Sequence, residues 1–261
     1  MSGTATTALR IVSYNLLHGM HLARRGTVDL PAVAEVLAEV DADVVALQEV
    51  DRDQARSGHV DQAADLGDRL GMRGVFCAAL SGSPDHSWTP ATDTTTGPAY
   101  GVGLLTRLPL RAVRRVALPG GGAGTRSPDA SLRNPGWDHE PRVALAAAVD
   151  VGGRTVEFIV THLSYLPWRA VRQLRTATAA ATAPTAVLVG DLNLPAALVR
   201  ALPAWRHAGG AATYPAWKPR VQVHHVLVRG GARVDGVTVH PRSTSDHRPL
   251  IADLRVPAAA G

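Results

Sequence analysis

The chain has 261 residues, of which 46% are hydrophobic and 19% charged, a composition that excludes a disordered or fibrous protein and allows a sizeable core. The net charge of +5 favours a phosphate-bearing partner, nucleic acid included, although Lys218 is the only lysine and the arginine excess also fits genome-wide compositional bias. Residues 1–10 lack the apolar run of a secretory signal, and the single cysteine, Cys77, excludes an internal disulfide. We therefore expect a cytoplasmic monomer without membrane insertion.

The first third of the chain alternates strand and helix patterns. Residues 9–15 form an apolar, β-rich run, and Asp29 stands where the N-cap of a helix belongs, with apolar residues at helical spacing up to Val40. A buried strand is expected at 44–47. A second amphipathic helix is expected from about Val60 to Leu70, ended by Gly71.

The rest of the chain is richer in strands. A two-residue turn, Gly152-Gly153, joins two of them as a hairpin. The pattern predicts a helix at 168–183 and strands at 75–80, 100–105, 110–117, 142–149, 155–161, 186–189, 221–228, 234–239 and 250–256. Residues 81–98 and 118–141 fit no element, and loops of this length usually cover a site or are mobile.

No repeat, linker or charge block divides the chain, so we expect one domain over residues 1–261. Within it, residues 1–8 are expected to be a disordered N-terminus and residues 257–261 a C-terminal tail. Hairpin-linked strands mixed with helices favour an α/β fold in which two mixed β-sheets pack face to face with helices outside, a four-layer sandwich.

Polar clusters follow the apolar strands at five places. They are Ser13-Tyr14-Asn15, Gln48-Glu49, Thr161-His162-Leu163, Gly190-Asp191-Leu192-Asn193 and Ser245-Asp246-His247. Strand ends at one edge of a sandwich converge, so these side chains can meet in one pocket. Carboxylates suit a hard divalent cation, and Asn and His side chains can donate hydrogen bonds to a phosphate. The combination favours phosphoryl-transfer chemistry.

Taken in order, these clusters resemble the endonuclease/exonuclease/phosphatase superfamily of metal-dependent phosphoesterases. The matching stretches are SYNLLHG (13–19), LQEVD (47–51), YGVGLLTR (100–107), EPRVAL (140–145), VTHL (160–163), VGDLN (189–193) and STSDHRPL (243–250). Each is short, but together they extend over nearly the whole chain. The resemblance implies the four-layer sandwich and a hydrolase that requires Mg²⁺ or Mn²⁺.

The resemblance also implies a metal site. Glu49 matches the principal metal ligand of the family, and Asn15 and Asp246 match residues near the same ion. Asp51 is a weaker metal candidate than Glu49, either beside the site or exposed.

The remaining matches concern the phosphate. Asp191 resembles the residue that orients or deprotonates the attacking water, and Asn193 one that holds a phosphate oxygen. His162 and His247 resemble two histidines that contact the scissile phosphate, one of which protonates the leaving oxygen.

Three further residues are candidates for substrate binding. Tyr100 and Arg142 match positions near the phosphate in the family, with packing and surface roles as the alternatives. His18 lies in the turn after Asn15, where it either lines the pocket or is simply solvated.

The chain departs from the family pattern at His224. Relatives carry an aspartate there, which accepts a hydrogen bond from the histidine that matches His247 and stabilises its charged form. Three interpretations remain open. In the first, His224 orients His247 as a neutral acceptor. In the second, an acid such as Asp253 or Asp235 replaces the aspartate, or the pair His224-His225 binds a softer metal such as zinc or manganese; in the third, the chain binds phosphates without turnover.

The expected function is hydrolysis of a phosphate ester by a metal-dependent enzyme. The loops 81–98 and 118–141 carry few basic residues, Arg126 and Arg133 being the exceptions, which favours a small-molecule or lipid-derived phosphate ester over a long nucleic acid. A nuclease and a degenerate phosphate-binding protein are the alternatives.

Overall fold

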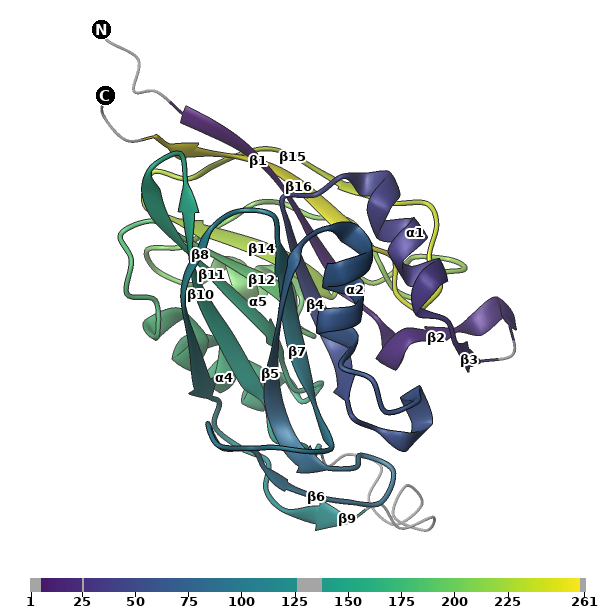
Figure 1. Cartoon of the computed structure of the whole chain (residues 1–261). Coiled ribbons are helices and arrows are strands. Elements are labelled where there is room, and N and C mark those ends of the chain that lie inside the picture. Colours follow the sequence, from purple (N-terminus) through teal and green to yellow (C-terminus); the bar gives the residue numbers. More distant parts are fainter. Residues whose placement is uncertain (1–5, 25, 126–137, 259–261) are drawn as a thin grey trace, which may run out of the picture.

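Two β-sheets pack face to face, with helices on their outer surfaces (Figure 1). The computed structural model describes residues 6–24, 26–125 and 138–258. The expected four-layer α/β sandwich is therefore confirmed.

The larger sheet has eight strands within the described residues. Its order is β15 (Arg233–Val239), β16 (Leu250–Pro257), β1 (Thr6–Asn15), β4 (Val44–Arg52), β7 (Ala99–Thr106), β5 (Arg73–Gly82), β6 (Ser87–Pro90) and β9 (Gly124–Thr125). Strand β1 runs parallel to β4 and antiparallel to β16. The two ends of the described chain therefore lie side by side (Figure 1).

The smaller sheet has six strands in the described part of the chain. Its order is β13 (Arg206–His207), β14 (His224–Arg229), β12 (Ala186–Asp191), β11 (Arg154–His162), β10 (Val143–Val151) and β8 (Leu110–Ala117). The short strands β2 (Met20–His21) and β3 (Thr27–Val28) pair with each other. Strands β10 and β11 form the expected hairpin, since Gly152 and Gly153 both have positive φ angles.

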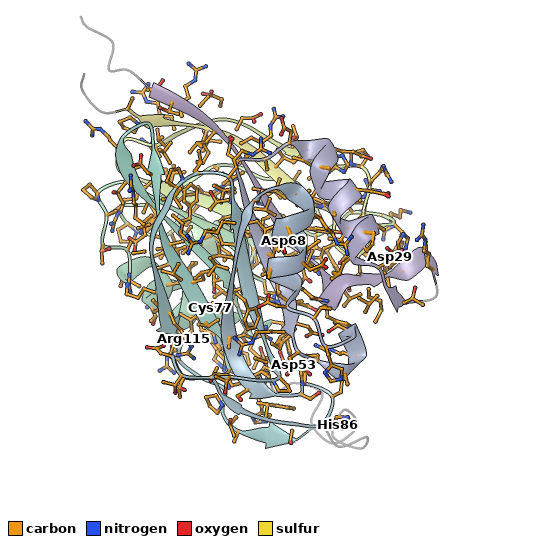
Figure 2. The ribbon with its side chains drawn as sticks, in the orientation of Figure 1. Asp29, Asp53, Asp68, Cys77, His86 and Arg115 are labelled. Carbon is orange, nitrogen blue, oxygen red and sulfur yellow. The ribbon has the colours of Figure 1, made fainter. Side chains whose placement is uncertain are left out.

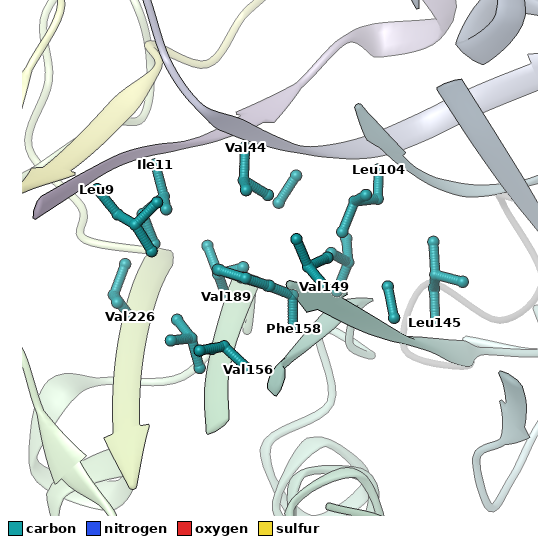
Figure 3. Close-up of a cluster of buried hydrophobic side chains, with 14 of the residues drawn as sticks. Leu9, Ile11, Val44, Leu104, Leu145, Val149, Val156, Phe158, Val189 and Val226 are labelled. Atoms are coloured by element: carbon teal, nitrogen blue, oxygen red, sulfur yellow. The ribbon is translucent and has the colours of Figure 1, made fainter. Parts of the chain in front are cut away.

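The central core lies between the sheets (Figure 3). Alternate residues of β1 and β4, among them Ile11 and Val44, meet Phe158 and Val189 of the facing sheet. Burying each such side chain contributes about 1.5–3 kcal/mol. The core thus holds both sheets, and the polar strand ends beyond it, in fixed positions.

The outer faces of the sheets are covered by helices. Helices α1 (Leu30–Val40) and α2 (Gln62–Leu70) pack on the larger sheet, and α4 (Pro167–Ala179) and α5 (Ala196–Arg200) on the smaller one. Short 3₁₀ turns lie at Leu17–Gly19, Leu22–Arg24 and Ala55–Ser57. The N-cap at Asp29 is confirmed, since its carboxylate accepts a hydrogen bond from Ala32 N (Figure 2). In the described part of the chain, every helix is too short or too polar to cross a bilayer.

The structure corrects several expected boundaries. Strand β1 begins at Thr6 and pairs with β16, so residues 6–8 are ordered, whereas residues 1–5 lie outside the described residues. Helix α4 ends at Ala179 instead of residue 183, because the Glu157 carboxylate accepts hydrogen bonds from the backbone of Thr182 and Ala183. Strand β14 begins at His224 instead of residue 221.

The two long segments without expected elements each contain a strand. Strand β6 pairs with β5 and lies within residues 81–98, and β9 pairs with β6. Their few residues explain why the sequence pattern missed them. Residues 126–137, which include Arg126 and Arg133, lie outside the described residues.

Gly190 provides a test of how tightly β11 and β12 approach each other. A Cβ at this position would lie 1.9 Å from the carbonyl oxygen of Thr161, its partner in β11. We expect Gly190→Ala to lower the free energy of unfolding by about 1–3 kcal/mol, because the strands must shift to relieve the overlap. Urea unfolding followed by circular dichroism measures this change.

The matched control is Gly236→Ala in β15, where a Cβ meets no atom within 4 Å. This control should change the free energy of unfolding by less than about 1 kcal/mol. Equal effects of the two substitutions would contradict the close approach at Gly190.

Candidate active site

Three titratable residues form a row across the smaller sheet. His162 in β11 pairs in register with Asp191 in β12, and Asp191 pairs in register with His224 in β14. Neighbouring strands lie about 4.8 Å apart, so the row is compact. All three residues are buried.

The Asp191 carboxylate is the centre of the site. Its Oδ1 accepts a hydrogen bond from Asn193 N at 3.2 Å, and its Oδ2 accepts one from Asn15 Nδ2 at 3.3 Å. Oδ2 also lies 3.7 Å from His247 Nδ1 and 3.9 Å from His162 Nε2. Burial raises the pKa of Asp191, whereas His247 and the Asn15 hydrogen bond lower it.

A β-bulge directs Glu49 toward Asn15. The register of β4 and β7 shifts between Gln48 and Val50, and Glu49 takes a left-handed φ of 54°. Its Oε1 accepts a hydrogen bond from Asn15 Nδ2 at 2.9 Å. The same amide nitrogen therefore contacts both Glu49 and Asp191, which lie on different sheets.

Glu49 and Asp246 lie close enough for the charge of Asp246 to act on Glu49. Burial raises the pKa of Glu49 to about 7; the Asn15 hydrogen bond opposes this rise, and the charges of Asp246 and Asp191 add to it. Ser245 Oγ donates to Asp246 Oδ1 at 3.1 Å and so holds that carboxylate in place. Carboxylate oxygens are the donors that Mg²⁺ prefers, and the holding of a cation by Glu49 and Asp246 stays a prediction.

Asn15 is placed between these carboxylates through its amide group. Its Oδ1 accepts a hydrogen bond from Leu17 N at 3.0 Å, which turns its NH₂ group toward Glu49 and Asp191. In this structure Asn15 therefore positions the expected metal ligand, and its role as a direct ligand stays a prediction.

His162 and Asn193 lie on the other side of Asp191. Arg142 Nη1 donates to His162 Nδ1 at 3.2 Å, so the neutral ring carries its proton on Nε2. Burial, followed by the charge of Arg142, lowers the pKa of His162 well below its usual value. Asn193, with a left-handed φ of 50°, places its Nδ2 3.3 Å from His162 Nε2.

Arg142 and Tyr100 are both buried beside this group. The Arg142 guanidinium forms ion pairs of 3.2 Å with Asp138 and with Glu140. Burial raises the pKa of Tyr100, and the nearby charge of Glu49 raises it further. The structure thus brings both expected substrate-binding residues to the site.

Asp51 has a different role from Glu49. It is fully buried, and its two carboxylate oxygens accept hydrogen bonds of 2.8 Å from Arg56, whose guanidinium also lies 5.5 Å from the centre of the Tyr100 ring. Because Arg56 binds both oxygens, Asp51 holds this arginine in place beside the Tyr100 ring.

His18 lies in the turn that follows Asn15. It has a left-handed φ of 45°, and its carbonyl oxygen accepts a hydrogen bond from Gln62 Nε2 at 2.7 Å. Burial lowers the pKa of its partly buried ring, and the charge of Arg56 lowers it further. The charges of Asp51 and Asp246 act on the same ring in the opposite direction, and the role of His18 in lining the pocket stays a prediction.

His224 does not orient His247 through a hydrogen bond. The two rings are tilted by 56° with their centres 5.2 Å apart, and neither His224 nitrogen has a hydrogen-bond partner among the described residues. The alternative acids are paired elsewhere, Asp253 with Arg10 and Asp235 with Arg255.

His225 also points away from the site. Its Nε2 donates to the carbonyl oxygen of Leu194 at 2.8 Å, and its Nδ1 lies 2.8 Å from His207 Nε2. A softer metal bound by the pair His224-His225 is therefore ruled out by the direction of the second ring.

Several residues of the site were missed in the sequence. Asp138 and Glu140 balance the charge of Arg142, Arg56 pairs with Asp51, and the Tyr214 ring lies 4.8 Å from that of His247. The sequence contains no signal for the Asp138–Arg142 pair, because a spacing of four residues predicts an ion pair only on a helix and residues 138–142 form no element. The sequence gives no signal for Tyr214 either, because its segment contacts the site only through tertiary packing.

The fold and the site together define a class of protein, an α/β sandwich whose strand ends bring buried carboxylates beside imidazoles. The chain belongs to the Endonuclease/Exonuclease/phosphatase family, whose pattern matches residues 12–247. A comparison with curated proteins finds no match.

Solved structures share the fold. An endonuclease/exonuclease/phosphatase from Beutenbergia cavernae DSM 12333 is 24% identical with a TM-score of 0.75, covering 96% of this chain and 72% of its own. The mannosyl-6-phosphatase Bt3783 of Bacteroides thetaiotaomicron VPI-5482 is 16% identical with a TM-score of 0.63, covering 94% and 99%. A humanized TDP2 of D. rerio is 16% identical with a TM-score of 0.64, covering 95% and 99%.

The Asp51–Arg56 pair predicts a large effect on stability. Arg56→Gln leaves the fully buried Asp51 carboxylate without its charged partner, which should lower the free energy of unfolding by about 3 kcal/mol or more. Urea unfolding measures the loss.

Arg255→Gln is the control for this prediction, because the Arg255–Asp235 pair is exposed to solvent. The control should cost about 0–1 kcal/mol. A loss from Arg56→Gln no larger than that of the control would show that the Asp51 carboxylate is not buried as described.

Proposed function

We propose that the chain hydrolyses a small phosphate ester with the help of a divalent cation, water being the nucleophile. The observation that carries this proposal is the position of Asp191. Its buried carboxylate shares the Asn15 amide with Glu49 and lies within 4 Å of two imidazoles. Family membership supports the same reaction class.

Glu49 and Asp246 would hold the cation, with Asn15 keeping Glu49 in place. A bound Mg²⁺ or Mn²⁺ polarises the phosphoryl group and stabilises the charge that develops on its oxygens. The charges of Asp246 and Asp191 both act on Glu49, although burial is the larger cause of its raised pKa, and a cation would neutralise the negative charge of these carboxylates.

Asp191 accepts the proton of the attacking water. Burial raises its pKa, which makes the carboxylate a stronger base, and the Asn193 N–H fixes the direction of Oδ1. The water is thereby oriented by the same group that deprotonates it.

His162 and Asn193 bind phosphate oxygens through their N–H groups. Because Arg142 donates to Nδ1 and burial keeps the ring neutral, the Nε2–H of His162 is available to an oxygen on the side of Asp191. Donors fixed before the reaction stabilise developing negative charge without reorganisation. His247, whose Nδ1 lies 3.7 Å from Asp191 Oδ2, supplies the proton to the leaving oxygen.

The surroundings of the site favour a small ester over a long polyanion. The neighbouring described residues Asp85, Asp138 and Glu140 are acidic and pair with Arg56 or Arg142, which leaves little positive charge for extended phosphate contacts. Tyr165 and Trp217 are exposed and offer apolar contacts. A phosphorylated sugar is one candidate, given the named activity of the structurally similar mannosyl-6-phosphatase.

Asp191→Asn should lower kcat for a chromogenic phosphodiester, bis(p-nitrophenyl) phosphate, by about 10²–10⁴-fold, since the amide cannot accept the water proton. EDTA should abolish hydrolysis by the unmodified chain, and added Mg²⁺ or Mn²⁺ should restore it.

Asp253→Asn, which alters an exposed aspartate paired with Arg10, is the matched control and should retain the unmodified rate. Full activity of Asp191→Asn, or turnover that resists EDTA, would refute the proposed mechanism. Binding of phosphate without turnover under any divalent cation would favour the degenerate alternative.

The substrate class has its own test. With equal concentrations of phosphate groups, we expect kcat/KM for sugar phosphates or short-chain phosphodiesters to exceed that for plasmid DNA by at least about tenfold, because the acidic loops disfavour a long polyanion. A reversed ratio, steeply reduced by added salt, would favour the nuclease alternative.

A further inference from the structure

His224 is an unusual side chain for a protein interior. It is 0% exposed, and both of its ring nitrogens lack a hydrogen-bond partner among the described residues. Burying a polar group without a partner is costly, so such atoms are rare in folded proteins. Two unpartnered nitrogens on one fully buried ring point to a ligand.

The surroundings of His224 supply two further donors. The Nδ1 atom of His247 is likewise buried without a partner among the described residues. One ligand atom from each of Asp191, His224 and His247 lies within 4.8 Å of the other two. The three donor atoms therefore form a compact, buried group.

The spacing of these donors suits a metal better than a hydrogen bond. Asp191 Oδ2 and His247 Nδ1 are 3.7 Å apart, which is too long for a hydrogen bond. Two donors bound to one tetrahedral ion at about 2.0–2.1 Å are separated by about 3.4 Å. A small inward movement of the side chains would complete this arrangement.

We propose that Asp191, His224 and His247 form a second metal site, specific for a borderline transition ion such as Zn²⁺ or Co²⁺. Two imidazoles and one carboxylate are a donor set that these ions prefer over Mg²⁺. The three protein ligands leave a fourth position for water or a phosphate oxygen. An aspartate at position 224 would make the set harder, so the histidine determines the metal preference.

The second site lies next to the carboxylate site but uses different donors. Asn15 Nδ2 contacts both Glu49 and Asp191, which places the two sites side by side. Glu49 and Asp246 contribute only to the first site, and His224 only to the second. Asp191 and His247 are also the base and the acid of the proposed hydrolysis, so an ion at this second site would occupy both groups and compete with that reaction. Metal binding is measured without turnover, so the inference can fail separately from the proposed function.

An ion at this site would join the two sheets. Asp191 and His224 belong to the smaller sheet, whereas His247 lies in the segment before β16 of the larger sheet. An ion that binds only the folded chain stabilises it by mass action. Metal binding should therefore raise Tm as well as fill the site.

The test is titration of the metal-free full chain with Co²⁺, followed by the visible absorption of the ion, and competition by Zn²⁺. One equivalent of Co²⁺ should give the intense bands of a low-coordinate site, and Zn²⁺ should abolish them and raise Tm by several degrees. In His224→Gln the affinity should fall roughly 100-fold and the Tm increase should disappear.

Two variants serve as controls. His59→Gln removes an exposed imidazole elsewhere and should bind Co²⁺ like the unmodified chain. Glu49→Gln removes a ligand of the first site and should retain the Co²⁺ bands. Unchanged Co²⁺ binding by His224→Gln, or its loss in Glu49→Gln to the same degree, would overturn the second site.

A further variant covers the case in which His224→Gln fails to fold. His224→Asp should lose the preference for Zn²⁺ over Mg²⁺ in competition titrations while still binding a divalent ion. A preference equal to that of the unmodified chain would show that His224 is not a ligand.

Discussion

The site depends on one buried carboxylate that both sheets contact. Asp191 ends β12 of the smaller sheet, yet its Oδ2 accepts a hydrogen bond from Asn15 at the end of β1 in the larger sheet. A buried carboxylate is stable only when hydrogen bonds or charges compensate the loss of water. The packing of the two sheets and the charge of Asp191 therefore constrain each other, and the close approach of Gly190 to Thr161 fixes the strand end from which Asp191 projects.

The acids in and around the site differ in whether they form an ion pair with an arginine. Asp51 is neutralised by Arg56, and Asp138 and Glu140 by Arg142. The described residues give Glu49, Asp191 and Asp246 no arginine ion pair, so these three acids concentrate negative charge where a cation would bind. Because burial keeps His162 neutral, its ring can donate to a phosphate without competing for that cation. The groups that we propose to bind the cation and the phosphate are thus chemically distinct and lie side by side.

The sequence was sufficient for the architecture, and it named several residues that the structure brings together. Apolar strands that end in polar clusters predicted both sheets, and the register of β11, β12 and β14 then placed His162, Asp191 and His224 in one row. The bulge at Glu49 was not predictable, because a one-residue shift leaves no mark on the pattern of β4. The pairing of Asp51 with Arg56 and the missing hydrogen bond of His224 depend on tertiary geometry, which residue types alone do not encode.

A crystal structure of the full chain with Mn²⁺ and inorganic phosphate tests the central claim most directly, which is that strand ends from both sheets form one metal and phosphate pocket. The anomalous signal of Mn²⁺ should lie between Glu49 and Asp246, with phosphate oxygens bound to His162 Nε2 and Asn193 Nδ2. Phosphate bound elsewhere, or Mn²⁺ absent from both Glu49 and Asp246 at saturating concentration, would contradict the account.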